Sequence, residues 1–399
     1  MKFYVVILIG ILLFSSNTLL IIPSEADPIP GPKREGIHSV SGEYDISDVA
    51  TSQLIGEYLM PGQGRFGDKS LIRDLNGDGY DDLIVNSPGA PGVEDFPNAG
   101  RIYIWWGKHN FSLTDIDLET DDPDVLIKGG NEDSATFGDI TTGDIDSDGY
   151  LDLVIANPAQ PEGGRMFIIW GDGEWDPLIE IWTVNPDLPR GDPWAYNRSL
   201  ERMDVKGHTF LQVYANYQVG QTVIIEDMDL DGYDDLLFTS HGWENITILW
   251  GEADRLHFGD DYTIIYDISN AGFFGYDVAL GNLDSNGMPD LLVGAPIRKN
   301  FESDRNQCGA VFVYYDIGDL RGEEMVVSTR DARPIIYGSD AHDRLGRDIQ
   351  VMDVDGDGRD DIFLSAPDAD GPDNKRKDSG TIYYIKGGEE NEFPSVTDV

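Results

Sequence analysis

Short apolar runs separated by polar, glycine-rich turns recur along the chain, and they predict a protein built of β-strands. One set of runs lies at residues 83–85, 153–155, 236–238, 291–293 and 362–364. A second set, rich in aromatic and β-branched residues, follows at residues 102–106, 166–170, 246–250, 311–315 and 382–385. Such runs, bounded by glycine and turn residues, are typical of strands. No long stretch has the 3.6-residue period of an amphipathic helix.

These runs belong to a repeat that occurs five times. Each copy opens on an apolar residue followed by glycine, at Phe66-Gly67, Phe137-Gly138, Val219-Gly220, Phe274-Gly275 and Leu345-Gly346. A proline turn follows the first set of runs at Ser87-Pro88, Asn157-Pro158, Ala295-Pro296 and Ala366-Pro367, and the third copy has Ser240-His241-Gly242 instead. A fourth apolar piece closes the copy at residues 125–127, 264–266 and 335–337, with a poorer version at 203–206. Four short strands in a unit of roughly 55 to 85 residues are typical of a β-propeller blade.

The repeats predict an all-β propeller of four-stranded blades over residues 51–399, with an insertion at 172–202 that has no counterpart elsewhere. The fifth copy ends after its third strand, yet Leu54-Ile55-Gly56 resembles a fourth strand placed before the first copy. If it completes the last blade, the two ends of the chain close the ring and no sheet edge is left exposed. This arrangement gives five blades, and a propeller of up to seven blades is the alternative.

An Asp/Asn-rich loop of the form D-x-D-x-D-G-x-x-D lies between the first and second strand of each copy. Oxygen ligands at alternate positions of a tight loop converge on one hard cation, and glycine at the sixth position permits the turn. The predicted side-chain ligands are Asp74, Asn76, Asp78 and Asp82; Asp144, Asp146, Asp148 and Asp152; Asp227, Asp229, Asp231 and Asp235; Asn282, Asp284, Asn286 and Asp290; and Asp353, Asp355, Asp357 and Asp361. The predicted backbone carbonyl ligands, at the seventh position, belong to Tyr80, Tyr150, Tyr233, Met288 and Arg359.

Calcium fits these loops better than magnesium, which demands near-ideal octahedral geometry and keeps its waters. An EF-hand is excluded, because it requires a glutamate at position twelve and flanking helices. The residues at position twelve are all apolar, namely Val85, Ile155, Phe238, Val293 and Leu364. We therefore predict four to five calcium ions. The fourth loop has two Asp and two Asn, so its site is expected to be the weakest.

The N-terminus and the charge of the chain point to a place outside the cytoplasm. Lys2, an apolar run from Phe3 and the small-residue site at Ala26 have the layout of an export signal over residues 1–26, and residues 27–50 read as a linker or tail. An uncleaved membrane anchor is the alternative, because the apolar region is somewhat long for a signal. No later stretch is apolar enough to insert into a membrane. The net charge of −46 excludes nucleic-acid binding through phosphate neutralisation. The single cysteine, Cys308, excludes an intrachain disulfide.

The apolar-Gly pair, the acidic loop and the turn seen in Phe274-Gly275 and Gly294-Ala295-Pro296 resemble the FG-GAP repeats of the propeller in integrin alpha subunits and in bacterial and archaeal surface proteins. The resemblance covers about residues 54–387. It implies a propeller that holds calcium in the loops between the first and second strands and that recognises ligands elsewhere on its surface. The integrin propeller has seven blades and binds calcium in only some of them, whereas five units with five loops are present here.

The function that follows is a secreted or cell-surface calcium-binding module that recognises an extracellular protein or glycan. No motif typical of a zinc peptidase, a serine hydrolase or a phosphate-binding loop is present, so we expect no catalytic activity. An extracellular hydrolase or lyase acting on glycan or phosphodiester is the alternative, because propellers host such chemistry at their axial channel. A structural or calcium-buffering coat component is a third reading.

Overall fold

The computed structural model describes residues 54–56, 65–93, 97–109, 116–129, 138–157, 164–181, 201–205, 208–215, 219–240, 244–253, 261–267, 272–322, 324–326, 334–371, 375–388 and 396–398. All of these lie in one compact unit, Leu54–Ser112 with Ile116–Val399. The predicted export signal and the linker at 27–50 lie outside the described residues, as does the 182–200 part of the insertion. No helix among the described residues is long and apolar enough to cross a membrane.

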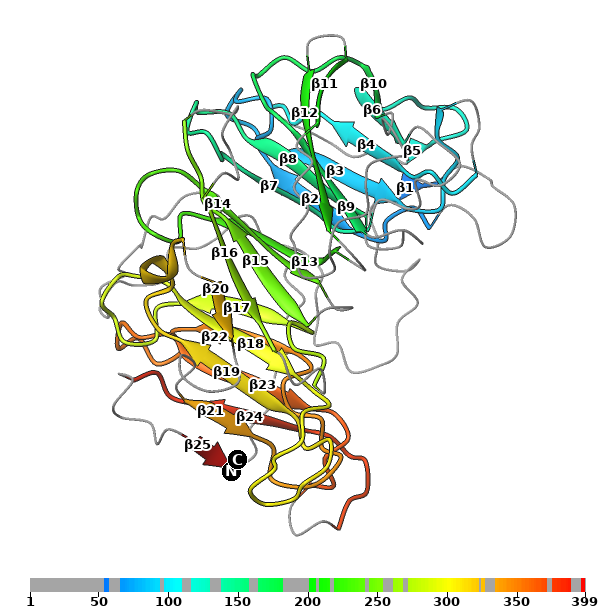
Figure 1. Ribbon diagram of the computed structural model, residues 1–399. Coiled ribbons are helices and arrows are strands. Elements are labelled where there is room, and N and C mark those ends of the chain that lie inside the picture. The colour runs from blue at the N-terminus through cyan, green and yellow to red at the C-terminus, as the bar shows by residue number, and fades with distance from the viewer. Residues whose placement is uncertain are drawn as a thin grey trace, which may run out of the picture. The chain divides into compact units, whose positions relative to one another are not determined.

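Five small sheets, one for each repeat, account for most of the described strands (Figure 1). The first contains β2 (Ser70–Arg73), β3 (Asp82–Ser87), β4 (Arg101–Trp105) and β6 (Val125–Gly129). The second contains β7 (Ile140–Gly143), β8 (Asp152–Asn157), β9 (Gly164–Ile169) and β12 (His208–Ala215). The third contains β13 (Val219–Glu226), β14 (Asp235–Ser240), β15 (Asn245–Leu249) and β16 (Tyr262–Tyr266). The fourth contains β17 (Val278–Gly281), β18 (Asp290–Ala295), β19 (Ala310–Tyr314) and β21 (Ile335–Tyr337). The fifth contains β22 (Ile349–Met352), β23 (Asp361–Ala366) and β24 (Thr381–Ile385). In every sheet these neighbours pair antiparallel, in chain order.

The sequence thus predicts the all-β class and nearly all of these strands, but it misplaces one. The sequence predicts the fourth strand of the second repeat at residues 203–206, whereas β12 pairs with β9 there. β11 (Glu201–Val205) lies outside it, antiparallel to β12. The reason is the length and composition of β12, whose Phe210, Val213 and Tyr214 favour a strand, so that the ladder with β9 runs from Phe210 to Ala215.

A further strand, which the sequence does not predict, joins the outer edge of several sheets in parallel. β10 (Leu178–Ile181) pairs with β6, β20 (Glu324–Val326) with β16, and β25 (Val396–Asp398) with β21. Each added strand follows the third strand of the next repeat, so consecutive repeats share a sheet. β1 (Leu54–Ile55) and β5 (Ile116–Asp117) pair in the same parallel way. β1 therefore pairs with β5 in the same way as the fourth strand of a sheet pairs with the strand added from the following repeat.

The glycine of the apolar-Gly pair and the residues before the proline turn hold each other in place. The N–H groups of Gly67, Gly275 and Gly346 donate to the carbonyls of Asn86, Gly294 and Ser365, at 2.9 to 3.0 Å. These three glycines have φ between +80° and +85°, a left-handed conformation that a side chain would strain. The repeat motif therefore pins the entry of the first strand to the end of the second.

The hydrophobic core lies between consecutive sheets. Ile84 and Ile104 of the first sheet cluster with Leu153 and Phe167 of the second, and comparable clusters join the second sheet to the third, the third to the fourth and the fourth to the fifth. The second residue of the acidic loop takes part in four repeats, where Leu75, Ile145, Met228 and Leu283 are fully buried. In the fifth repeat the corresponding Val354 is 48% exposed, and Ile382 and Tyr384 of β24 are 72% and 50% exposed. One face of the last sheet is therefore open among the described residues.

Candidate metal centres

The five acidic loops join the first strand to the second in every sheet, as the sequence predicts. Left-handed backbone occurs twice in each loop. At the sixth position stand Gly79, Gly149, Gly232, Gly287 and Gly358, with φ from +87° to +96°. At the fourth position, for which the loop motif specifies no residue, stand Gly77, Ser147, Leu230, Ser285 and Gly356, with φ from +55° to +77°. These two reversals let one short loop bend around a point.

Side chains of the loop build this turn by accepting backbone hydrogen bonds. In the second loop the two carboxylate oxygens of Asp144 accept from the N–H groups of Asp148 (3.0 Å) and Gly149 (2.9 Å). Asp74 and Asp227 make the same pair of bonds in their loops, and Asp353 accepts from Gly356 and Gly358. Asp148 in turn accepts from Tyr150 at 2.9 Å. The first and fifth positions therefore carry their carboxylates toward the interior of the turn.

The ninth-position aspartates have a second role that the sequence did not reveal. All five are fully buried, namely Asp82, Asp152, Asp235, Asp290 and Asp361. One oxygen accepts from the N–H of the second loop residue, as Asp152 does from Ile145 at 3.0 Å. The other accepts from the residue just beyond the third strand, as Asp152 does from Gly171 at 2.8 Å. Each of these aspartates therefore ties its loop to the end of the third strand, and each oxygen keeps a lone pair for a cation.

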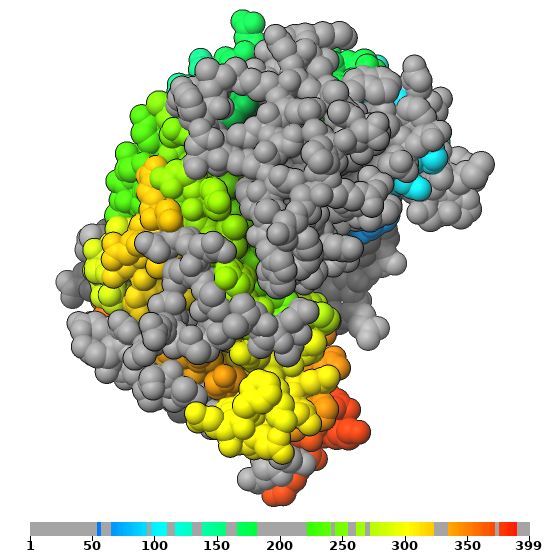
Figure 2. All heavy atoms as spheres, in the orientation of Figure 1, coloured from blue at the N-terminus to red at the C-terminus, as the bar shows by residue number. Residues whose placement is uncertain are grey.

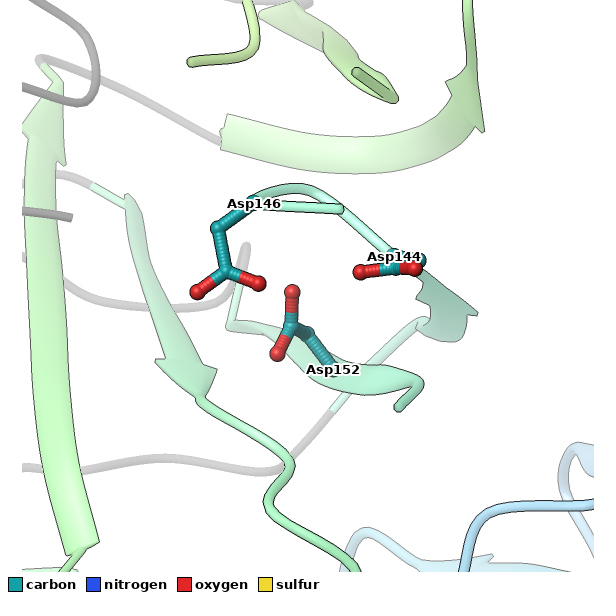
Figure 3. Close-up of side chains that lie close together, drawn as sticks. All are labelled: Asp144, Asp146 and Asp152. Atoms are coloured by element: carbon teal, nitrogen blue, oxygen red, sulfur yellow. The ribbon is translucent and has the colours of Figure 1, made fainter. Parts of the chain in front are cut away.

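Predicted ligands come together in three loops closely enough to hold one metal ion. Asp144, Asp146 and Asp152 offer carboxylate oxygens within 4.8 Å of one another and face a common point (Figure 3). Carboxylate oxygens also lie within 4.8 Å of one another in Asp227, Asp229 and Asp231, and in Asp353, Asp355 and Asp357. Among their predicted ligands the first loop contains one Asn and the fourth loop contains two. Clustered carboxylate oxygens in a tight loop are the donor set that calcium prefers.

Electrostatics in the loops favour a bound cation. Burial raises the pKa of Asp235 and of Asp290 to about 7, and the neighbouring loop carboxylates Asp229, Asp231 and Asp284 add to the rise. Burial likewise raises the pKa of Asp82 and Asp144. Like charges held a few ångströms apart repel each other, and a divalent ion between them removes that repulsion. The residues present therefore fit calcium in their chemistry as well as in their spacing.

Two loops also carry a basic side chain from this chain itself. The Arg321 guanidinium donates to Asp229 and Asp231 of the third loop, and to Asp261 at 2.7 Å. Figure 2 shows the gold segment around residue 320 lying against the light-green third repeat. Lys386 forms ion pairs with Asp355 and Asp357 of the fifth loop. It occupies the position of Trp106, Trp170, Trp250 and Tyr315 in the other repeats. The loop motif does not predict these two basic side chains, because they lie outside it in the sequence.

Neighbouring loops touch through the eighth loop residue. Asp234 of the third loop accepts a hydrogen bond from the backbone N–H of Asp144 in the second loop, at 2.8 Å. Asp360 of the fifth loop accepts one from Asn282 in the fourth loop, also at 2.8 Å. The backbone of the first loop residue is thus fixed by the following repeat. Leu151 and Pro289 occupy the eighth position of the second and fourth loops, and neither side chain is an acceptor.

Comparison with known proteins matches four segments to the FG-GAP repeat family, at residues 66–105, 137–167, 274–314 and 345–385. The chain is an FG-GAP repeat protein. Each matched segment spans an apolar-Gly pair, an acidic loop and the strands around it. The third repeat, with its divergent Val219-Gly220, lies outside the matched segments. The FG-GAP resemblance inferred from the sequence is therefore confirmed.

This FG-GAP repeat protein has relatives of two kinds. It is 24% identical over 328 residues to human phosphatidylinositol-glycan-specific phospholipase D. This match covers 76% of the chain and 35% of the relative. It is 30% identical over 162 residues to integrin alpha-5 of Xenopus laevis, which covers 39% of the chain and 14% of the relative. A crystal structure of the V. cholerae biofilm matrix protein Bap1 matches with a TM-score of 0.27 and 13% identity, over 81% of this chain and 48% of that one. The chain thus spans about a third or less of the length of these curated relatives.

Proposed function

We propose that this FG-GAP repeat protein is a calcium-binding β-propeller that acts outside the cell as a recognition module for a protein or glycan. The observation that supports it most is the recurrence of one loop geometry in five repeats, with converging carboxylates in three of them. Calcium would be held by the side chains at loop positions one, three, five and nine and by the carbonyl at position seven. Its chemical contribution is charge neutralisation, which fixes the loops and the surface they support.

The number of ions is the first quantity to measure. We expect four to five calcium ions per chain, counted by isothermal titration calorimetry and by elemental analysis after dialysis. Asp144→Ala and Asp227→Ala each remove a first-position ligand and should each lower the count by one. A chain that binds no calcium at millimolar concentration would contradict the proposal.

The ring is proposed to close by β1 joining β24 as the fourth strand of the last sheet, which gives five blades. Two observations support this. The last sheet has three described strands and an open apolar face. β1 also pairs with β5 as β6, β16 and β21 pair with the connections of the repeats that follow them. By that equivalence Leu54 lies opposite Tyr383.

A disulfide tests the closure. Leu54→Cys with Tyr383→Cys should cross-link within one chain on oxidation, because paired strands bring Cβ atoms to about 4.5–5.5 Å. Leu54→Cys with Tyr262→Cys, on the third sheet, is the matched control and should not cross-link. Mass spectrometry of unreduced peptides reads out both. Equal cross-linking of the two pairs, or none in the first, would argue against closure by β1.

Recognition without catalysis is the proposed role, and an enzyme is the second candidate. The relatives include a phospholipase D that acts, by its name, on phosphatidylinositol-glycan, and this match favours the alternative. Both kinds of relative match this chain, and the chain spans only 35% of the phospholipase. The sequence that this chain shares with both kinds of relative supports a role in binding better than it supports the catalytic activity of one of them.

One pair of assays separates these roles. The purified chain should bind ligands on glycan and surface-protein arrays in calcium, and lose that binding in chelator. It should release no product from phosphatidylinositol-glycan or polysaccharide substrates. Steady turnover that rises in proportion to the amount of chain would favour the enzyme instead. A coat or calcium-buffering component would bind calcium without binding any arrayed ligand.

Secretion or display at the cell surface is proposed from residues 1–26. Fused to a reporter that is active only after export, this segment should give activity, and Lys2→Glu together with a charged residue in the apolar run should abolish it. N-terminal sequencing of the exported chain distinguishes a cleaved signal from an anchor. Nucleic-acid partners are not expected at a net charge of −46.

A further inference from the structure

The fourth acidic loop differs from the others in a way that leaves one buried atom without a partner. Asn282 occupies the first position, where the other four loops have Asp. Asp74, Asp144, Asp227 and Asp353 all accept two backbone hydrogen bonds from their own loops. The Oδ1 atom of Asn282 is buried and has no hydrogen-bond partner among the described residues. A buried acceptor in that state is costly, and a bound cation is one of the few explanations for it.

A residue outside the loop compensates for the missing charge. Just beyond the third strand, four repeats have glycine, at Gly107, Gly171, Gly251 and Gly387, and each donates its N–H to the ninth-position Asp. The fourth repeat has Asp316 there, and its N–H makes the same bond to Asp290, at 3.0 Å. All five repeats therefore make the same backbone hydrogen bond here, and in the fourth repeat Asp316 adds a carboxylate beside it.

The backbone of Asp316 is left-handed, unlike that of the glycines at the same position in the other repeats. Its φ of 52° and ψ of 61° lie in the left-handed region, immediately before the short helix η2 (Ile317–Leu320). A side chain makes this conformation costly, and the glycines at this position in the four other repeats do not have positive φ. Strain of this kind is retained at sites where the side chain is needed.

The Asp316 carboxylate points at the fourth loop. Its Oδ1 accepts from Nδ2 of Asn286 at 2.6 Å, and the same Nδ2 donates to Oδ2 of Asp284 at 3.1 Å. Two carboxylate oxygens from separate segments thus converge on one atom. Oxygens gathered in this way are what a calcium ion needs.

We propose that Asp316 is a calcium ligand of the fourth loop and supplies the carboxylate that Asn282 and Asn286 lack. The inference rests on the proposed calcium binding. With Asp316 the fourth site has three carboxylates, from Asp284, Asp290 and Asp316, as many as the first loop has in Asp74, Asp78 and Asp82. The fourth site then has as many carboxylates as the first, so it is not expected to be weaker than the first, contrary to what its loop alone predicts.

The test compares Asp316→Gly, Asp316→Asn and Asp319→Asn in the full chain by calcium calorimetry. Asp319 is exposed and lies in the same short helix, so Asp319→Asn removes the same charge from the same element. We expect Asp316→Gly to weaken one site about tenfold or more, or to remove one ion from the count. Asp316→Asn should be intermediate, and Asp319→Asn should match the parent chain.

Melting in chelator separates the loss of a ligand from damage to the fold. Glycine relieves the left-handed strain, so Asp316→Gly should melt at the same or a higher temperature than the parent without calcium, and gain less from calcium. If the parent chain binds no calcium, the proposed function fails and this inference with it. If the parent binds calcium and Asp316→Gly binds the same number of ions with the same affinities, only the role of Asp316 is overturned.

Discussion

At the scale of single residues, backbone strain at the fourth loop position makes a direct prediction. Leu230 has φ of +61° and is 55% exposed, while the first and fifth loops have glycine at that position. A left-handed residue other than glycine costs about 1–2 kcal/mol, and glycine loses about 0.5–1 kcal/mol more backbone entropy on folding. Leu230→Gly should therefore raise the free energy of unfolding by about 0.5–1 kcal/mol in urea denaturation.

The reverse substitution is its control. Gly356 has φ of +77°, and a Cβ built there meets no atom within 4 Å. Gly356→Leu should therefore destabilise through the backbone alone and by a similar amount. Two shifts of the same sign would show that the left-handed conformation does not govern stability at this position.

The lysine on the fifth loop predicts a change in calcium affinity. Lys386 contacts Asp355 and Asp357, which raise its pKa, and it must give way when calcium binds the same carboxylates. Lys386→Ala should tighten calcium binding at one site by about two- to fivefold, the range expected for an exposed ion pair. The gain should shrink at high salt. Lys377→Ala, an exposed change away from the loop, is the control for calorimetry and should leave all affinities unchanged.

At the scale of elements, the ninth aspartate should stabilise its hairpin even without calcium. Asp152 is fully buried and accepts from both Ile145 and Gly171. Asp152→Ala leaves two buried N–H groups without partners, which should cost about 2–5 kcal/mol of unfolding free energy in chelator. Asp148→Ala, at the exposed fifth position, should cost little in chelator although it too weakens calcium binding. Equal losses for the two variants in chelator would assign Asp152 to metal binding alone.

The elements also show what the sequence can and cannot predict. The hairpins around each loop follow from local signals: apolar runs, turn residues and glycine at the sixth position. The parallel strands β10, β20 and β25 do not, because their pairing depends on the outer edge of the preceding sheet rather than on their own composition. Residues 172–202 therefore read as an unrelated insertion, although Leu178–Ile181 within them extends the first sheet.

The metal sites also have a part that the sequence predicts and a part that it does not. The loop motif gives the ligand positions, yet Asp316, Arg321 and Lys386 reach the loops from 25 or more residues beyond them in sequence. One signal for Asp316 was present. The third strand is followed by Trp-Gly in three repeats and by Lys-Gly in the fifth, and the fourth repeat breaks this pattern with Tyr315-Asp316. Aligning the repeats beyond the loop would have singled it out.

At the scale of the whole molecule, the negative charge lowers the stability of the fold and calcium binding raises it. A net charge of −46 repels itself in any compact state, and the acidic loops gather part of that charge at the ends of neighbouring sheets. Each ion bound only by the folded chain adds about 2.7 kcal/mol of stability when calcium is at a hundred times its dissociation constant. Four or five such sites would add about 11–14 kcal/mol, which is comparable to the usual total stability of about 5–15 kcal/mol.

The most direct test is the melting temperature of the full chain in calcium, in magnesium and in chelator at equal ionic strength. Matched ionic strength removes simple charge screening as a cause. Calcium should raise the melting temperature strongly over chelator, and magnesium should do so far less, since it keeps its waters. Coincident melting curves in all three conditions would contradict the claim that the acidic loops of this FG-GAP protein hold calcium.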